Sequence, residues 1–485
     1  MAESLHDKIL ALEQESRQLE PTGQDLEKLT NQVIAYGHHY LNNVDNLKAY
    51  DKDFALNNDL LAAGFPEKGK DIAQLLPIIE QHVDKPGINP ASGNHLGYIP
   101  GGGVYPTALG DYLAAVTNQY SGVFYAGPGA VQMENLVLRW IADFLGFPAG
   151  SLGNLTSGGS IANLIAIVTA RDAKGIKSKL VEDSCIYLTH QAHHSVQKAI
   201  RIAGLDEAKL CYIKTDEQFR MDTQMLEKQI EQDVLANKKP FLVIASAGTT
   251  DTGVVDPLDQ IADICSSYNL WFHVDAAYGG FFMLVDELRD KFKGIKRADS
   301  LTIDPHKGLF LAYGLGAVIV RDVAALQKTH YYMANYMQDA VGDSHEPSPA
   351  DLSPELTKHF RGLRIWLPLQ LFGVKPFRQA LLEKHYLAQY FYHEIRKMGF
   401  ETGPEPALSV CIYRYNQNVS EANLFNQRLI KRIQDDGEIF ISSTTIDGIF
   451  WLRIAVLVFR THLKAVDRLL ALLREHRDEL LKLEV

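Results

Sequence analysis

The sequence predicts an α/β fold with three parts: a large domain on a mainly parallel sheet, a small C-terminal α+β domain and a helical N-terminal arm. From about residue 135 to 325, short β-branched apolar runs alternate with helical stretches, as in parallel sheets that are covered on both faces. From about residue 4 to 88, apolar residues recur every three or four positions, which indicates amphipathic helices. A glycine- and proline-rich stretch at 93–110 ends that helical segment.

We therefore expect an arm over 1–88, a large domain over 89–375 and a small domain over 376–485. In the large domain, the predicted strands are CIYLT (185–189), FLVIASA (241–247), LWFHVDAA (270–277), SLTIDP (300–305) and GAVIVR (316–321). In the small domain, the pattern predicts helices over 377–397, 420–435 and 463–482 and strands over 408–414 and 450–457.

Composition excludes several classes of protein. The 485 residues are 46% hydrophobic and 22% charged, unlike a disordered or fibrous chain. The net charge of -11 comes without a basic stripe, so a nucleic acid is not an expected partner. No apolar run is long enough for a membrane span, and the N-terminus lacks secretory or transit character, so we expect a cytoplasmic protein.

The four cysteines show no CxxC pairing, which indicates neither a disulfide framework nor a thiolate metal site. We predict no metal and interpret all four as buried thiols: Cys185, Cys211, Cys265 and Cys411.

Two ionisable residues end predicted strands of the large domain. Lys307 follows SLTIDPH, at the kind of strand end where ligands bind in α/β sheets. Asp275 ends the apolar strand LWFHVD, where a carboxylate needs a cationic partner. A protonated pyridine nitrogen would serve, with the small Ala276 and Ala277 leaving room for a flat ring. The alternatives are a lysine that caps the strand at the surface and a buried Asp–Arg pair.

Two further segments fit an aromatic phosphate ligand. Ser157 to Ser160, in NLTSGGS, precede a helix whose free N–H groups attract anions, although the same pattern also makes an ordinary N-cap. His193 and His194 follow the 185–189 strand and open a helix. Adjacent histidines suit a metal poorly, but one could lie flat over a ring; a satisfied structural histidine is the alternative.

With HVDAAYGG (273–280) and DPHK (304–307) together, the chain resembles the group II pyridoxal-phosphate-dependent amino acid decarboxylases over about residues 90–465. The resemblance implies fold type I with a seven-stranded sheet and pyridoxal 5'-phosphate as the cofactor. It implies that Lys307 holds the cofactor as a Schiff base, that Asp275 pairs with the ring nitrogen, and that His193 and Ala277 cover the two ring faces. Residues that match cofactor or phosphate positions are Gly159, Ser160, Thr250 and His306, and Arg453 matches an arginine near the substrate.

The implied reaction is decarboxylation of an L-amino acid to an amine and carbon dioxide. An aromatic substrate is favoured if an apolar pocket is lined by Tyr98, Ile99, Pro100, Phe124 and Tyr125, although each could equally be core. An acidic substrate of the glutamate or aspartate type would need Arg364 or Arg453. Further alternatives are a carbon–carbon lyase acting on a phosphorylated amine, an aldehyde-forming oxidative deaminase and a non-enzymatic scaffold. The resemblance also implies a homodimer, to which the arm is suited.

Three departures from the family pattern bear on the substrate and on the final proton. The loop tyrosine that protonates Cα in relatives is expected near Ser348–Pro349, yet no tyrosine occurs between Met337 and Trp366. The polar stretch 337–357 is the segment that we expect to be mobile. Gly308 replaces a frequent tryptophan, and Gly101 to Gly103 replace bulkier residues. Alternative proton sources are a dimer partner or one of four side chains: Tyr332, Tyr336, His345 and His193.

Overall fold

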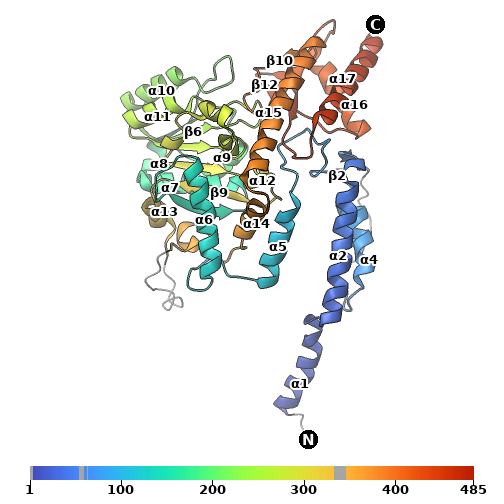
Figure 1. The fold of residues 1–485 in the computed structure, drawn as a ribbon. Helices are drawn as coiled ribbons and strands as arrows, with labels where there is room; N and C mark the ends of the chain where they lie inside the picture. The colour runs from blue at the N-terminus through green and yellow to red at the C-terminus, as the bar shows by residue number, and fades with distance from the viewer. Residues whose placement is uncertain (1–3, 54–58, 63, 333–345, 485) are drawn as a thin grey trace.

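The computed structural model describes residues 4–53, 59–62, 64–332 and 346–484. Its centre is a sheet surrounded by helices (Figure 1). This sheet has seven strands in the order β3-β9-β8-β7-β6-β4-β5. The strands are β3 (Leu152–Thr156), β4 (Ser184–Leu188), β5 (Lys209–Tyr212), β6 (Lys239–Ser246), β7 (Trp271–Asp275), β8 (Ser300–Ile303) and β9 (Gly316–Val320).

Most neighbouring strands of this sheet run parallel. The strands β8, β7, β6, β4 and β5 form the parallel part, whereas β9 is antiparallel to both of its neighbours. The link from β8 to β9 is short and holds only the one-turn helix α12 (Pro305–Gly308), so the chain turns back instead of crossing over. The predicted mainly parallel sheet is confirmed, and each of the five predicted runs forms a strand.

Helices cover both faces of the sheet, as the continuous apolar strands require. Helix α7 (Gly159–Ala173) packs against β3, β9, β8, β7 and β6 and places Ile165 and Ala166 in the core. Other helices of this domain are α6 (Pro128–Phe144), α9 (His194–Ile202), α10 (Thr223–Leu235), α11 (Leu258–Ser267), α13 (Val323–His330), and α5 (Tyr105–Thr117) with α14 (Gly362–Phe372).

The C-terminal part is a four-stranded antiparallel sheet with helices, and each predicted helix and strand there occurs. Its elements are α15 (Val374–Lys397), β10 (Glu401–Thr402), β11 (Val410–Arg414), α16 (Ala422–Asp436), β12 (Ser442–Ile446), β13 (Ile449–Ala455) and α17 (Leu463–Glu484). The sequence prediction lacked β12, which pairs with β13 through an Asp447-Gly448 turn with positive φ at both residues. An Asp-Gly pair between strands is a hairpin signal, so this strand was predictable.

The domain boundaries at 88/89 and 375/376 stay predictions. Helix α15 spans the second of them and contributes to two hydrophobic cores. Its first turns give Phe377 and Leu381 to the core of the large sheet, whereas Phe391 and Ile395 belong to the core of the C-terminal sheet. The two sheets are therefore joined by a continuous helix.

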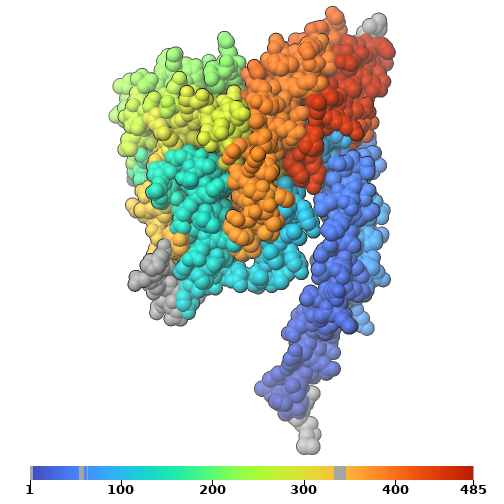
Figure 2. Space-filling model, in the orientation of Figure 1, coloured from blue at the N-terminus to red at the C-terminus, as the bar shows by residue number. Residues whose placement is uncertain are grey.

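The N-terminal arm extends away from the rest of the chain (Figure 1), and its helices stand clear of it over much of their length (Figure 2). It consists of α1 (Leu5–Ser16), α2 (Gly23–Asn43), the short α3 (Asp59–Ala62) and α4 (Ile72–Ile79). Neither α1 nor α2 buries a single residue. Within the described ranges, no helix combines the length and apolar character needed to cross a lipid bilayer.

Candidate active site

The carboxyl ends of the central strands surround a cavity of about 270 Å³. Its wall is built from the segments that follow β3, β4, β6, β7 and β8. Eight predicted residues line this one cavity: Lys307, Asp275, Ala277, His193, Gly159, Ser160, Thr250 and His306. The cavity thus gathers residues from five strand ends, as expected where α/β sheets bind ligands.

Asp275 ends β7 and is only 8% exposed. Its carboxylate accepts hydrogen bonds from Asn163 Nδ2 at 3.0 Å and from the Ala277 N–H at 3.1 Å. Both donors are neutral, and no described arginine or lysine pairs with this carboxylate, so the alternative of a buried Asp–Arg pair is not what the structure shows. Because burying an unpaired carboxylate is costly, Asp275 fits a cationic ligand group such as a protonated ring nitrogen.

Lys307 reaches the same cavity from α12, directly after β8. Its Nζ lies 2.9 Å from Asp304 Oδ2. Asp304 is 1% exposed, and its Oδ1 has no hydrogen-bond partner among the described residues. Asp304 therefore holds the amine of Lys307 at the cavity wall. The sequence prediction quoted Asp304 within the DPHK motif without giving it a role.

His193 is the N-cap residue of α9, and its Nδ1 accepts the Ser195 N–H at 3.2 Å and lies 2.7 Å from Ser195 Oγ. Ser195 Oγ in turn accepts a hydrogen bond from Asn163 Nδ2 at 3.2 Å. Ser195 must then donate its own proton to His193 Nδ1. The neutral ring of His193 therefore carries its proton on Nε2, and burial lowers the pKa of His193, which favours this neutral form.

The hydrogen bonds behind the cavity have one consistent direction. Trp271 Nε1 donates to Ser300 Oγ at 2.9 Å, and Ser300 Oγ lies 2.9 Å from His273 Nδ1. The other nitrogen of His273, Nε2, lies 3.1 Å from Asn163 Oδ1 and donates to it. The Asn163 amide thereby has both hydrogens free for Asp275 and Ser195. Sequence reasoning missed Asn163, which lies one helical turn after Gly159 in an otherwise apolar stretch.

The start of α7 presents a place for an anion. The N–H groups of Gly159 and Ser160 have no partner within the helix, because the first turn of a helix leaves its donors free. Gly159 packs so closely that an added Cβ would lie 2.9 Å from Asp304 Oδ2 and 3.3 Å from Ala277 Cβ. Across the cavity, His306 Nδ1 lies 2.5 Å from the carbonyl oxygen of Leu315. A phosphate group fits the free N–H groups of Gly159 and Ser160, whereas the Nδ1 proton of His306 is used by the Leu315 carbonyl oxygen.

Comparison with known proteins identifies the family to which a chain with this set of cavity residues belongs. The model of the pyridoxal-dependent decarboxylase conserved domain matches residues 56–416. The chain belongs to this decarboxylase family. Pyridoxal 5'-phosphate is therefore its cofactor, and its reaction is the decarboxylation of an amino acid, as the sequence resemblance predicted.

Relatives of this decarboxylase cover nearly the whole chain. An aromatic-L-amino-acid decarboxylase of Bacillus atrophaeus is 33% identical, over 89% of this chain and 91% of that protein. Tyrosine decarboxylase 2 of Arabidopsis thaliana is 28% identical, over 87% and 80% of the two chains. The crystal structure of Oryza sativa TDC with PLP and tryptamine superposes with a TM-score of 0.89, at 24% identity, over 95% of this chain and 99% of that one. These matches confirm the predicted fold type I.

A second, smaller cavity of about 130 Å³ adjoins the first, and His306 and Tyr313 line both. Its other lining residues are Pro90, Ala91, Gly101, Gly102, Gly103, Leu311 and Ala312. An added Cβ at Gly101 would lie 2.5 Å from the His306 carbonyl oxygen, so the glycine run lets two backbones approach closely. At Gly308, an added Cβ would lie 2.7 Å from Phe281 Cβ, which leaves no space for the tryptophan that the family resemblance leads us to expect there.

The predicted substrate residues do not line the cofactor cavity in this chain. Tyr98 and Tyr125 are exposed, and Pro100 is buried outside the cavity wall. Arg453 is buried and donates to the Asp251 carbonyl oxygen at 3.2 Å and to Ser442 Oγ at 2.9 Å, with Nη2 unpaired among the described contacts. Their substrate roles stay predictions.

The other candidate for an acidic substrate, Arg364, is already engaged. Its guanidinium donates to the carbonyl oxygens of Ala312, Tyr313 and Gly314, at 2.5 to 3.4 Å. Arg364 is buried behind the loop that follows α12 and does not line the cavity. It therefore supports the cavity wall from outside.

The proton donor for Cα is not a tyrosine at the expected loop position. Ser348 Oγ accepts the Phe124 N–H at 3.0 Å, and the Pro349 carbonyl oxygen accepts a hydrogen bond from Asn154 at 2.7 Å. Neither Ser348 nor Pro349 lines the cavity. Among the alternatives, Tyr332 is 91% exposed, whereas Tyr336 and His345 lie outside the described residues. His193 does line the cavity, and so does Tyr313, which sequence reasoning had not considered.

Proposed function

We propose that this enzyme decarboxylates aromatic L-amino acids. The observation that carries the proposal is the meeting of Lys307, Asp275 and His193 in one cavity that opens beside an uncharged, glycine-lined one. No arginine lines either cavity in the described part of the chain. The guanidinium of Arg364 donates its hydrogen bonds to backbone carbonyl groups instead. A carboxylate side chain would therefore lack a partner, whereas a ring would fit. The 33% identical relative is an aromatic-L-amino-acid decarboxylase, which supports the same choice.

The roles that we propose for the cavity residues follow from their positions. Lys307 would bind the aldehyde carbon of the cofactor through Nζ, and Asp275 would hold the proton on its ring nitrogen. His193 and Ala277 would cover the two faces of the ring. Gly159, Ser160, Thr250 and His306 would bind the cofactor or its phosphate. Of these, the role of Asp275 has the strongest support, because its carboxylate has neutral donors and no cation.

When bound, the cofactor supplies an electron sink for the pair left on Cα as carbon dioxide departs. The protein's part is to keep charges and protons where they are needed. Asp275 favours the protonated ring nitrogen, and Asn163 fixes the orientation of that carboxylate. Asp304 holds Lys307 Nζ beside the cavity through an ion pair. Covering the ring with His193 would limit access of water to the reacting carbon.

A proton must then be delivered to Cα, and we propose His193 Nε2 as its source. The hydrogen bonds from Ser195 to Nδ1 leave the proton of the neutral ring on Nε2. If delivery failed, the electron pair left on Cα could instead reduce oxygen to hydrogen peroxide, and hydrolysis would then release an aldehyde and ammonia, which is the oxidative alternative. Carbon dioxide release without oxygen uptake supports simple decarboxylation, whereas equal uptake of oxygen would contradict it. A strict need for a phosphate group on the substrate would instead indicate a carbon–carbon lyase.

We further propose that the enzyme is a homodimer. Apolar side chains project from the arm into solvent, among them Leu5, Ile9, Leu12, Leu26 and Val33. Contiguous exposed apolar surface of this kind marks an association site. Sedimentation at working concentration should give twice 54.2 kDa, and a monomer near 54.2 kDa would overturn this part. The cytoplasmic location belongs to the same proposal and rests on sequence character alone.

The first experiment joins a spectrum to a substrate panel. We expect the wild type to show a visible absorption band that borohydride removes by fixing the cofactor to Lys307, as peptide mass mapping would report. Lys307→Ala should lose the trapped adduct and all turnover, whereas the control Lys293→Ala, at an exposed position, should keep both. Carbon dioxide release across aromatic, acidic and basic L-amino acids then tests the substrate class. Preferred release from glutamate or aspartate would overturn the aromatic assignment.

A further inference from the structure

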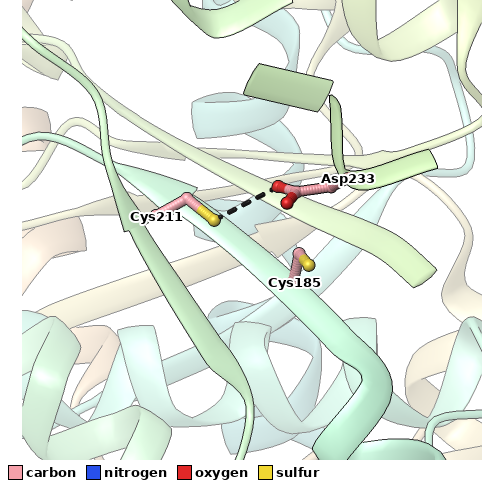
Figure 3. Close-up of side chains that lie close together, drawn as sticks. All are labelled: Cys185, Cys211 and Asp233. Carbon is pink, nitrogen blue, oxygen red and sulfur yellow. Dashed lines mark hydrogen bonds between the residues drawn. The ribbon is translucent and has the colours of Figure 1, made fainter. Parts of the chain in front are cut away.

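Two cysteines that are distant in the sequence meet at the edge of the large sheet, away from the active site. Cys185 lies on β4 and Cys211 on the edge strand β5, and both lie close to Asp233 in the last turn of α10 (Figure 3). The two sulfur atoms and a carboxylate oxygen all lie within 4.8 Å of one another, and all three residues are buried. None of them lines either cavity of the active site.

The two oxygens of Asp233 have different partners. Oδ1 pairs with Lys209 Nζ at 2.5 Å. Oδ2 accepts hydrogen bonds from Tyr187 at 2.9 Å, from Gln229 at 3.2 Å and from the thiol of Cys211 at 3.4 Å. Lys209 and Gln229 thus fix the carboxylate, and the weakest of its donors is a thiol whose proton a metal ion can replace.

We propose that Cys185, Cys211 and Asp233 form a binding site for a thiophilic divalent cation of the zinc class. With Zn–S near 2.3 Å and Zn–O near 2.0 Å, tetrahedral coordination separates a sulfur from an oxygen ligand by about 3.5 Å and two sulfurs by about 3.8 Å. The distance from Cys211 Sγ to Asp233 Oδ2, 3.4 Å, already matches the first value. Because the three ligand atoms all lie within 4.8 Å of one another, only a small side-chain adjustment of Cys185 is needed to reach the coordination distances.

Charge balance supports a cation at this place. The negative charge of Asp233 is already balanced by the positive charge of Lys209. Binding one divalent ion while releasing the two thiol protons would therefore leave the net charge of the buried cluster unchanged. The carboxyl end of α10 adds the negative end of a helix dipole.

The ligand set selects soft ions over hard ones. Two thiolates favour zinc-class ions and discriminate against magnesium and calcium, which prefer oxygen ligands. A fourth position would be taken by water, which can enter from the side of Lys209, since the side chain of Lys209 is 46% exposed. Bound metal would join β4, β5 and α10, so we expect it to stabilise the sheet edge without taking part in catalysis.

The test uses the cofactor-loaded full chain. After chelator treatment and dialysis against Zn²⁺ under reducing conditions, we expect one equivalent of zinc per chain by elemental analysis. Co²⁺ should give the visible absorption of a tetrahedral thiolate site, in the red region where the cofactor does not absorb. Cys185→Ser, Cys211→Ser and Asp233→Asn should each weaken zinc binding at least about 10-fold. The control variants Cys265→Ser and Cys411→Ser, at the other two buried thiols, should bind zinc like the wild type.

Three outcomes would overturn the proposal. They are a wild type that retains no stoichiometric zinc, cobalt that shows only octahedral absorption, and zinc binding that survives in the Cys211→Ser variant. Mass spectrometry that finds Cys185 and Cys211 joined in a disulfide in reduced buffer would also contradict it. If a variant fails to fold, as its far-ultraviolet circular dichroism would reveal, the wild-type zinc content and cobalt spectrum still decide. Zinc should also raise the melting temperature of the wild type and leave that of Cys211→Ser unchanged.

Discussion

Asn163 Nδ2 lies 3.0 Å from Asp275 Oδ2, so a single buried amide orients the carboxylate that we assign to the ring nitrogen. The same amide donates to Ser195 Oγ at 3.2 Å, and Ser195 contacts His193. One residue of α7 therefore holds both the group proposed to pair with the cofactor nitrogen and the group proposed to cover the ring. Its own orientation is set by His273, which donates to its oxygen.

Replacing Asn163 by alanine should weaken cofactor binding. The change removes a hydrogen bond to a charged group, worth about 1.5–3 kcal/mol, so we expect the dissociation constant of pyridoxal 5'-phosphate to rise about 10- to 100-fold. Titration of the apoenzyme, followed by absorbance, measures it. Thr169→Val is the matched control on the same helix, because Thr169 bonds only its own helix backbone at Ile165. An unchanged dissociation constant in Asn163→Ala would mean that Asp275 does not need the hydrogen bond from Asn163 for cofactor binding.

Asp275→Asn should retain the fold and lose most of the turnover. Asparagine has nearly the same shape as aspartate but cannot hold a proton on the ring nitrogen, so the electron sink is weakened. We expect kcat to fall by about 10²- to 10³-fold, as for removal of a preorganised electrostatic group. Steady-state carbon dioxide release gives kcat. A variant that bound the cofactor and kept half of the wild-type rate would show that the carboxylate is not the partner of the ring.

The sequence located much of this site because strand ends can be read from apolar runs. Lys307, Asp275 and His193 each follow such a run, and parallel strands bring their carboxyl ends to one edge of the sheet. Asn163 was missed because it stands inside an apolar helical stretch, where a single polar residue carries little signal. Its spacing of four from Gly159, one helical turn, was the available clue.

Tertiary proximity explains the other omissions. The four-residue strand β5 has mixed burial and was not recognised, so nothing placed Cys211 beside Cys185. Likewise β3, LGNLT, contains a glycine and an asparagine that are rare in strands, yet it is fully buried. An added Cβ at Gly153 would lie 1.7 Å from the Val318 carbonyl oxygen on β9. Packing of this kind overrides local propensity and leaves no trace in a single sequence.

His193→Gln tests the source of the Cα proton. Glutamine can still cover part of the ring and donate a hydrogen bond, but its amide N–H is a weaker acid than the imidazole N–H of neutral His193. We expect kcat to fall by about 10²- to 10⁴-fold, with a larger share of aldehyde and oxygen uptake per carbon dioxide released. Tyr313→Phe is the comparison, since Tyr313 also lines the cavity. If Tyr313→Phe, and not His193→Gln, produced the aldehyde, the proton would come from Tyr313.

Gly159→Ala should disturb the phosphate end of the cavity. The new methyl group would lie 2.9 Å from Asp304 Oδ2 and 3.3 Å from Ala277 Cβ, so the Asp304 carboxylate, which pairs with Lys307, must shift. Overpacking of this degree costs about 1–3 kcal/mol, which predicts a 5- to 150-fold weaker binding of the cofactor. Gly129→Ala, near the start of α6 with nothing within 4 Å of the added Cβ, should bind the cofactor like the wild type. Equal binding by both variants would exclude a tight fit at Gly159.

His273 should make the enzyme less stable in acid. Burial lowers the pKa of His273 to about 4 from an ordinary value of 6.5. Between these values the unfolded chain binds a proton that the folded chain does not, so stability is full above pH 6.5 and is lost as the pH falls towards 4. From pH 7 to pH 5 this one group should remove about 2 kcal/mol from the free energy of unfolding. Urea unfolding of wild type and His273→Gln at both pH values measures the difference, with His393→Gln, an exposed position on α15, as the control. The loss between the two pH values should be about 2 kcal/mol smaller in His273→Gln, and an equal loss in both proteins would mean that His273 is charged in the folded state.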